Sequence, residues 1–192
     1  MTNPRPLDGI RVIEVGQLLA GPFAGTFLGY FGAEVIKVEP PGKGDPIREW
    51  RLLDEDGTSF WWRSLGRNKQ SVTANLRSEK GREVVARLAQ EADVLIENFK
   101  PGTMEKWGLG PADLEKENPD LIYVRVSGYG QTGPNSKKPG YASVTEAFSG
   151  FRHLNGFSDR PPVRPNLSMG DTVAGLHAVL GVLMALLERR QD

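Results

Sequence analysis

The chain has 192 residues, enough for one domain with a sizeable core, and its length gives no reason to expect two. Its 24 basic and 24 acidic residues give a formal net charge of zero, so nothing indicates a nucleic-acid surface, and the absence of cysteine excludes disulfides and a thiol nucleophile. No apolar run approaches the length of a membrane span, and the N-terminus has neither signal nor transit character. We therefore expect a cytoplasmic protein that binds no membrane.

The first forty residues have the pattern of a βαβ unit. A β-branched run over 9–15 predicts a strand, and a turn over 16–22 leads into a helix predicted over 23–31. Residues 32–39 are predicted to form a second strand after a glycine stop. The turn is rich in glycine but is not Gly-x-Gly-x-x-Gly, so a nicotinamide dinucleotide site has only weak support.

Strands and helices continue to alternate after a loop over 40–46 and an irregular, aromatic-rich region over 47–65. Further strands are predicted over 72–76, 93–97 and 121–126. Further helices are predicted over 77–90, 103–107, 111–118 and 144–154. This alternation predicts an α/β fold with a Rossmann-like, open, mostly parallel sheet flanked by helices. Polar loops that follow the strands lie where open α/β sheets bind ligands.

A long apolar helix is predicted from Thr172 to Arg190, after a segment rich in proline and glycine that ends at Asp171. Asp171 is therefore expected at a helix N-terminus, where free N–H groups and the helix dipole stabilise negative charge and lower a carboxylate pKa. Two interpretations stay open on this stretch alone. Asp171 either caps the helix or acts as a nucleophilic carboxylate.

The two histidines do not predict a metal site. His153 and His177 have neither a second imidazole nor a carboxylate at metal-ligand spacing, so we expect structural or surface roles and no metal ligands. The sequence also lacks a Gly-x-Ser-x-Gly elbow, which leaves a serine hydrolase unsupported.

Short motifs follow one another along nearly the whole chain: 6–15 (PLDGIRVIEV), 19–22 (LAGP), 28–39 (LGYFGAEVIKVE), 68–71 (NKQS), 93–99 (DVLIENF), 101–102 (PG), 128–134 (GYGQTGP) and 170–171 (GD). Each motif is weak alone. Together and in this order they resemble the class III CoA-transferases, the family that includes formyl-CoA transferase, carnitine CoA-transferase and 2-methylacyl-CoA racemases.

The resemblance implies that Asp171 attacks an acyl-CoA thioester, passing through an aspartyl anhydride and an aspartyl thioester. It implies acyl-CoA and a small carboxylic acid as substrates, with no permanently bound cofactor and no metal. The CoA-binding positions that it implies are Leu19, Ala20, Pro40, Ala74, Asn75, Leu76, Arg77, Asn98, Phe99, Lys100, Lys106, Pro139, Gly140, Tyr141 and Ala142. Arg77 and Lys106 are expected to contact phosphates.

Departures from the family pattern bear on the substrate. Formyl-CoA transferases carry glutamine at the position of Leu19 and arginine at that of Pro40, so a formyl and oxalate pair is disfavoured. Racemases place a histidine base where this chain has Tyr141, which favours transfer over racemisation. Ala142 replaces an acidic residue found in many transferases. Arg164 is a candidate partner for the second carboxylate of a dicarboxylic acid, and a succinyl-CoA-type donor is expected.

Members of the family run to roughly twice this length, so residues 1–192 are expected to be the N-terminal part of the CoA-binding large domain. The small domain and the returning C-terminal segment would be absent. A full-length protein would form an interlocked homodimer. Three alternatives stay open: a 2-methylacyl-CoA racemase-like enzyme, a truncated non-catalytic CoA-binding domain, and a plain nucleotide-binding α/β domain.

Overall fold

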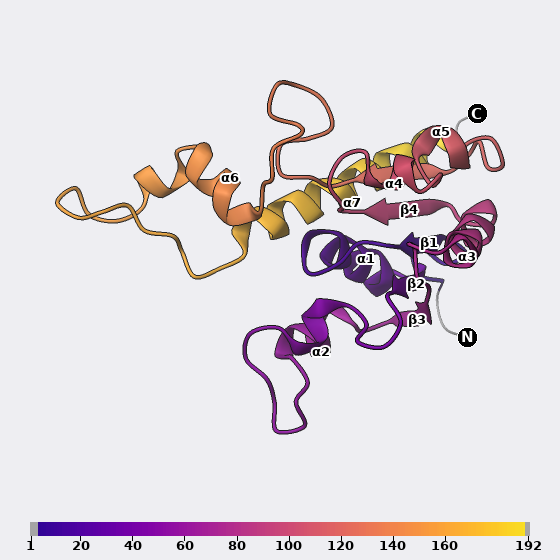
Figure 1. Ribbon diagram of the computed structural model, residues 1–192, viewed down its shortest axis with the longest axis horizontal. Coiled ribbons are helices and arrows are strands. Elements are labelled where there is room, and N and C mark those ends of the chain that lie inside the picture. The colour runs from indigo at the N-terminus through magenta and orange to yellow at the C-terminus, as the bar shows by residue number, and fades with distance from the viewer. Residues whose placement is uncertain (1–3, 191–192) are drawn as a thin grey trace.

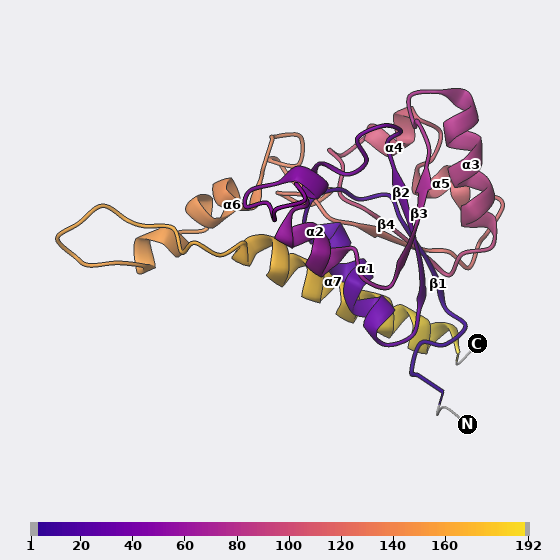
Figure 2. The same cartoon turned by 90° about the horizontal axis from the view of Figure 1, so that it is seen from below.

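The computed structural model, which describes residues 4–190, has a five-stranded sheet covered by helices on both faces (Figures 1 and 2). The strands lie in the order β3-β2-β1-β4-β5, and every neighbouring pair is parallel. Their bounds are β1 (Arg11–Glu14), β2 (Glu34–Glu39), β3 (Lys69–Thr73), β4 (Val94–Glu97) and β5 (Ile122–Arg125). The predicted Rossmann-like α/β fold is confirmed.

The α-helices are α1 (Ala20–Tyr30), α2 (Phe60–Leu65), α3 (Glu79–Gln90), α4 (Thr103–Lys106), α5 (Pro111–Leu114), α6 (Ala142–Phe148) and α7 (Met169–Arg189). Two short 3-10 helices are η1 (Pro46–Glu49) and η2 (Phe151–Leu154). The region predicted as irregular contains η1 and α2. Helix α2 begins there because Ser59 caps it by accepting from the Trp61 N–H. Strand β3 begins at Lys69 rather than at residue 72, because Lys69 pairs with Val35 of β2.

Alternation along the strands divides the core between the two faces of the sheet. Val12 and Ile96 point toward α1 and α7, where they join Ala24, Leu28, Val179, Val182 and Leu186. On the opposite face, the cluster includes Ile13, Ile36, Leu95, Val85, Met104 and Leu114, which connects the strands to α3, α4 and α5. Full burial of one such aliphatic side chain contributes about 1.5–3 kcal/mol, so these two layers hold the strand ends in place.

Helix α7 lies beside α1 and corrects one expectation. It has 21 residues with a mean hydropathy of 1.7 in its most apolar window, so by length and composition alone it could cross a membrane. The expectation that no apolar run reaches this length was wrong. Core helices of soluble proteins satisfy the same two criteria, and α7 packs on α1 and β5 as part of the core. Val173, Leu176, Leu180, Met184 and Leu187, however, remain exposed along it.

The direction of chain progression across the sheet reverses between β1 and β4, which are neighbours. In open α/β sheets a crevice forms beyond the carboxyl ends of the strands at this point. The loops after β1 and β4 therefore determine the site.

Candidate active site

Asn98 joins the two loops at the reversal point. Its Oδ1 accepts from the Gln17 N–H at 2.8 Å, and its Nδ2 donates to the Gln17 carbonyl at 2.8 Å. Gly16 comes so close to Asn98 that an added Cβ would lie 2.9 Å from Oδ1. The next residue, Leu18, has a positive φ of 62°, and its N–H donates to Asp45 Oδ1 at 3.1 Å. The loop after β1 is thus fastened by side chains from two other segments.

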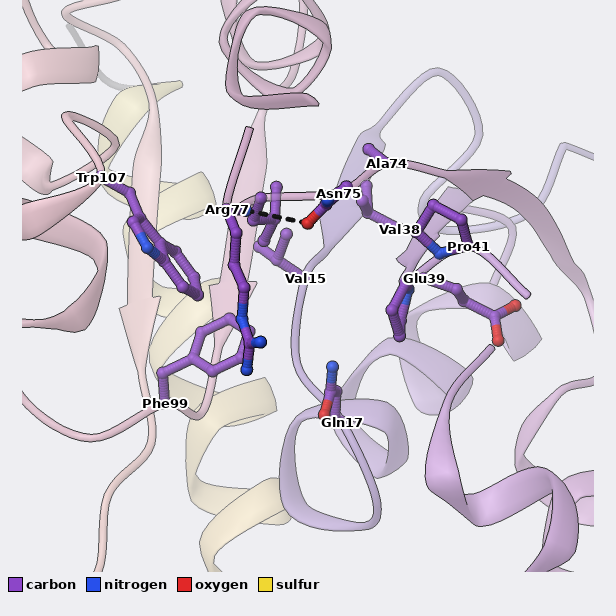
Figure 3. Close-up of a pocket in the computed structure, with 12 residues that line it drawn as sticks. Val15, Gln17, Val38, Glu39, Pro41, Ala74, Asn75, Arg77, Phe99 and Trp107 are labelled. Carbon is purple, nitrogen blue, oxygen red and sulfur yellow. Dashed lines mark hydrogen bonds between the residues drawn. The ribbon is translucent and has the colours of Figure 1, made fainter. Parts of the chain in front are cut away.

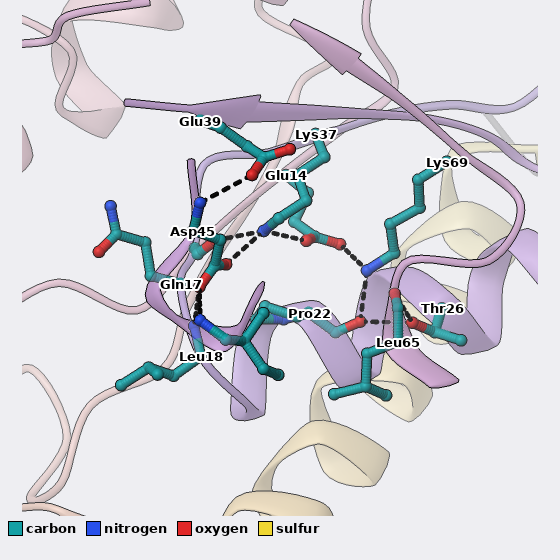
Figure 4. A network of polar contacts seen from close by, with 12 residues as sticks. Glu14, Gln17, Leu18, Pro22, Thr26, Lys37, Glu39, Asp45, Leu65 and Lys69 are labelled. Carbon is teal, nitrogen blue, oxygen red and sulfur yellow. Dashed lines mark hydrogen bonds and ion pairs between the residues drawn. The ribbon is translucent and has the colours of Figure 1, made fainter. Parts of the chain in front are cut away.

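A buried ion network supports the same loop (Figure 4). Lys37 Nζ lies 2.9 Å from Glu14 Oε1, 2.7 Å from Asp45 Oδ2 and 3.1 Å from the Gly16 carbonyl. Lys69 Nζ lies 2.6 Å from Glu14 Oε2 and 2.8 Å from the carbonyl of Pro22.

The network balances two ammonium groups against two carboxylates, all almost fully buried. Burial alone would raise the pKa of Glu14, but Lys69 and Lys37 outweigh it and hold that pKa below its usual range. Lys37 also donates to the Gly16 carbonyl, and Lys69 donates to the Pro22 carbonyl in the first turn of α1. The ionised network therefore holds both ends of the segment from Gly16 to Pro22.

A first cavity of about 670 Å³ opens at the carboxyl ends of the strands (Figure 3). Residues that line it include Val15, Gln17, Val38, Pro40, Ala74, Asn75, Leu76, Arg77, Phe99 and Trp107. Phe99 and Trp107 meet edge to face at 5.4 Å between ring centroids, and Figure 3 shows Arg77 reaching in beside them. The cavity therefore combines an aromatic wall with an exposed guanidinium, which suits a nucleotide-sized anion.

A second cavity of about 650 Å³ contains Asp171. Residues that line it include Leu18, Leu19, Ala20, Trp50, Asn98, Phe99, Lys100, Lys138, Pro139, Gly140, Tyr141, Ala142, Gly170 and Asp171. Gln17 and Phe99 line both cavities, so the two are neighbours across these residues. A long ligand seated in the first cavity can thus extend past Phe99 toward Asp171.

Asp171 lies in the first turn of α7, as predicted, but Ser168 is the N-cap residue. Burial is the main cause that raises the pKa of Asp171, and the nearby Glu146 carboxylate raises it further, while Arg164 and Arg51 lower it. The expectation that this pKa is lowered was wrong, because burial and the Glu146 charge outweigh the two arginines and the backbone hydrogen bond at the helix start. Asp171 is not the N-cap residue, although the Ser168 side chain makes no capping hydrogen bond.

Arg164 is paired within the protein. Its Nε donates to Glu146 Oε2 at 2.6 Å and its Nη2 to Glu146 Oε1 at 3.3 Å, while the Gly170 N–H donates to the same carboxylate at 3.2 Å. Glu146 thus connects α6 and the 155–166 segment to the first turn of α7. Arg164 is already neutralised, which contradicts its expected role as a free partner for a substrate carboxylate.

All but one of the predicted site residues line one of the two cavities. The exception is Lys106, which is exposed on α4, next to Trp107. Sequence reasoning missed Gln17, Trp50, Trp107 and Glu146. Only Gln17 carried a usable signal, because it directly precedes the Leu18-Leu19-Ala20 turn after a strand. No group of three or more His, Asp or Glu side chains within residues 4–190 has the arrangement of a metal site.

Comparison with known proteins relates this site to one family. The chain is 54% identical over 189 residues to succinyl-CoA--D-citramalate CoA-transferase of Chloroflexus aurantiacus, covering 98% of this chain and 47% of that protein. It is 41% identical to human succinyl-CoA:glutarate CoA-transferase, covering 98% of this chain and 43% of that protein. A CAIB/BAIF family protein from Brucella suis superposes with a TM-score of 0.92 at 40% identity, covering 98% of this chain and 51% of that one.

The chain therefore spans about half the length of the curated relatives it matches. The model of CoA-transferase family III matches residues 7–192, nearly the whole sequence. The family resemblance inferred from the ordered motifs is confirmed, and this chain belongs to CoA-transferase family III.

Proposed function

We propose that this chain is the CoA-binding part of a CoA-transferase that moves CoA from succinyl-CoA to a small dicarboxylic acid through intermediates on Asp171. One observation carries the proposal: a half-buried carboxylate at a helix start shares a cavity with Phe99 and Gln17, which also line the strand-end cavity. The nucleotide of CoA and the nucleophile Asp171 can thus occupy two adjoining cavities.

The relatives support the substrate class. Their names pair succinyl-CoA with citramalate and glutarate, both small dicarboxylic acids. For this chain we infer the nucleotide end of CoA in the first cavity, near Arg77, and the pantetheine arm along Phe99. The thioester would then reach Asp171 in the second cavity, with Lys100 and Lys138 on its border. CoA is a substrate here, and no permanently bound cofactor is expected.

The chemistry follows from a carboxylate nucleophile. An Asp171 oxygen attacks the succinyl carbonyl, forms a mixed anhydride and expels the CoA thiolate. The thiolate attacks the aspartyl carbonyl, forms an aspartyl-CoA thioester and releases succinate. The acceptor carboxylate repeats the first exchange on this thioester, and the thiolate then takes the acceptor acyl group and frees Asp171. Partial burial removes water that would hydrolyse the anhydride.

The test uses the full-length protein that contains these residues. Succinyl-CoA and candidate dicarboxylic acids are incubated together, and new CoA thioesters are measured by mass spectrometry. We expect Asp171→Asn to fold and bind CoA but to lose transfer by several orders of magnitude, because an amide cannot form the anhydride. With an acceptor acid labelled by heavy oxygen in its carboxylate, the label should appear on Asp171 after turnover. Full activity of the variant without label would refute the nucleophile.

The exposed apolar face of α7 supports the predicted homodimer of the full-length protein. Leu176, Leu180, Met184 and Leu187 are between 39 and 67% exposed, which is unusual for four apolar residues on one helix. We propose that this face is covered in the dimer. A monomer in analytical ultracentrifugation of the full-length protein would contradict it.

The main alternative is a CoA-binding domain without catalysis. Calorimetry and turnover assays of residues 1–192 and of the full-length protein distinguish the two. CoA binding without turnover in both proteins would favour the alternative. A racemase would require a base at Tyr141, whose side chain is 75% exposed, and would interconvert the isomers of a 2-methylacyl-CoA.

A further inference from the structure

Arg51 is held in an unusual backbone conformation. Among the non-glycine residues within 4–190, Leu18, Arg51 and Asn68 have positive φ, and the value at Arg51 is 61°. Asparagine visits this left-handed region with little difficulty, but a long side chain such as arginine does so at a steric cost. Leu18 lines the second cavity, and Arg51 directly follows Trp50, which lines it too. Strain of this kind gathers at binding sites, where the surrounding structure maintains it.

Hydrogen bonds on both sides of Arg51 maintain its position. The fully buried Ser59 donates from Oγ to the Trp50 carbonyl at 2.7 Å and from its N–H to the Arg48 carbonyl at 2.9 Å. The Phe60 N–H donates to the Leu52 carbonyl at 3.3 Å. The Arg51 guanidinium carbon then lies 4.2 Å from the centroid of the Trp50 ring. A guanidinium stacked on a ring keeps its edge N–H groups available for another partner.

Arg51 also differs from Arg48 and Arg164 by its lack of an ion-pair partner. Arg164 is paired with Glu146, and Arg48 is paired with Glu39. No carboxylate within residues 4–190 forms an ion pair with Arg51, and its charge still reaches Asp171, whose pKa it helps to lower against the effects of burial and Glu146. An unpaired guanidinium is thus held beside the cavity that contains Asp171.

We propose that Arg51 binds the free carboxylate of a dicarboxylic acyl group whose other end reacts at Asp171. The inference rests on the proposed function and adds the residue that selects the substrate class. A guanidinium edge binds a carboxylate through two parallel hydrogen bonds. The succinyl donor and the dicarboxylic acceptor occupy the site in turn, and each carries one free carboxylate. One cation therefore serves both halves of the reaction.

The first experiment measures binding in the full-length protein with Asp171→Asn, which prevents turnover. Succinyl-CoA and butyryl-CoA have acyl chains of equal length and differ in the free carboxylate. Adding Arg51→Asn should reduce the preference for succinyl-CoA by roughly ten- to a hundred-fold, the effect of losing a charge-assisted pair. Arg51→Lys should lose part of it, because the charge stays while the bidentate geometry goes.

Asparagine favours the left-handed backbone, so Arg51→Asn should unfold thermally at or above the wild-type temperature. Arg67→Gln is the matched control. Arg51 lies over Trp50, which lines the second cavity. Arg67 also lies over an aromatic ring, 5.6 Å from the centroid of Tyr30, but that ring lines neither cavity. The control should leave the preference unchanged.

A second experiment compares kcat/KM for glutarate and for valerate as acceptors in the active enzyme. The glutarate preference should fall in Arg51→Asn by a similar factor. A folded Arg51→Asn protein that keeps both preferences would overturn the proposal while the transferase function stands. If the wild type transfers no CoA but Arg51→Asn still weakens succinyl-CoA selectively, the proposed function fails and carboxylate binding by Arg51 stands.

Discussion

Asn98 and Gln17 exchange two hydrogen bonds of 2.8 Å, one in each direction, across the point where the sheet reverses. The side-chain amide of Asn98 accepts from the Gln17 N–H with its oxygen and donates to the Gln17 carbonyl with its nitrogen, whereas a carboxylate could only accept. This pair fixes the distance between the segments that follow β1 and β4. Gln17 also lines both cavities. We therefore expect binding in either cavity to depend on this pair of hydrogen bonds.

Replacing the amide tests this relationship. Asn98→Asp keeps the acceptor but sets a carboxylate against the Gln17 carbonyl, so we expect a loss of about 1–3 kcal/mol in unfolding free energy and weaker CoA binding. Asn118→Asp is the control, because Asn118 donates to the carbonyls of Ala89 and Ala92 away from both cavities. It should lose stability without losing CoA affinity. Equal CoA affinity in the two variants would disprove the role of Asn98.

The buried ion network should be sensitive to one methyl group. A Cβ on Gly25 would overlap Glu14 Oε2, so Gly25→Ala must displace the carboxylate from Lys69. Disrupting a buried pair costs about 3–5 kcal/mol, and urea unfolding should report a loss of that order. Gly181→Ala should instead stabilise by about 0.5–1 kcal/mol, since a Cβ there meets nothing within 4 Å and alanine favours the helix. A similar effect of both substitutions would contradict this account.

Glu97 should make the protein less stable as the pH rises. Burial raises the pKa of Glu97 to about 7, against the opposing hydrogen bond from the Phe99 N–H and the charge of Arg125. Between its ordinary pKa of 4.5 and about 7 the unfolded chain releases this proton while the folded chain keeps it, so stability falls across that window. The loss is about 3 kcal/mol by linkage. Denaturant titrations of wild type and Glu97→Gln between pH 4 and pH 8 should differ in slope there.

Glu39 should make the protein more stable as the pH rises, the opposite of the effect of Glu97. Burial would raise its pKa, but hydrogen bonds from Arg48, Ser71 and the Asp45 N–H lower it to about 2. The stability that Glu39 contributes is present above its ordinary pKa of 4.5 and is lost as the pH falls from there to about 2. Glu39→Gln should therefore flatten the acid side of the stability profile. A profile equal to that of wild type below pH 4.5 would count against this assignment.

Arg77 and Lys106 were both predicted to contact CoA phosphates, but only Arg77 lines a cavity. Calorimetry with the full-length protein should find CoA affinity reduced roughly ten-fold or more by Arg77→Ala, the loss of a charge-assisted contact. Lys106→Ala should have a smaller effect. Dephospho-CoA, which lacks the ribose phosphate, locates the contact. If the replaced residue binds that phosphate, its substitution should reduce the affinity for dephospho-CoA less than the affinity for CoA. The reverse order of effects would mean that α4 moves to meet the nucleotide.

The sequence alone determined the alternation of strands and helices, the ordered family motifs and the position of Asp171 at a helix start. The alternation and the helix start depend on periodicity and local backbone chemistry, which neighbouring residues decide, while the motifs indicate the family by their resemblance to it. Tertiary structure alone decided which charges remain free. Arg164 and Glu146 are 18 residues apart and Gln17 and Asn98 are 81 apart, so no local pattern records their contacts. The raised pKa of Asp171 and the unpaired state of Arg51 depend on such contacts, because burial and charge pairing arise only when distant segments pack together.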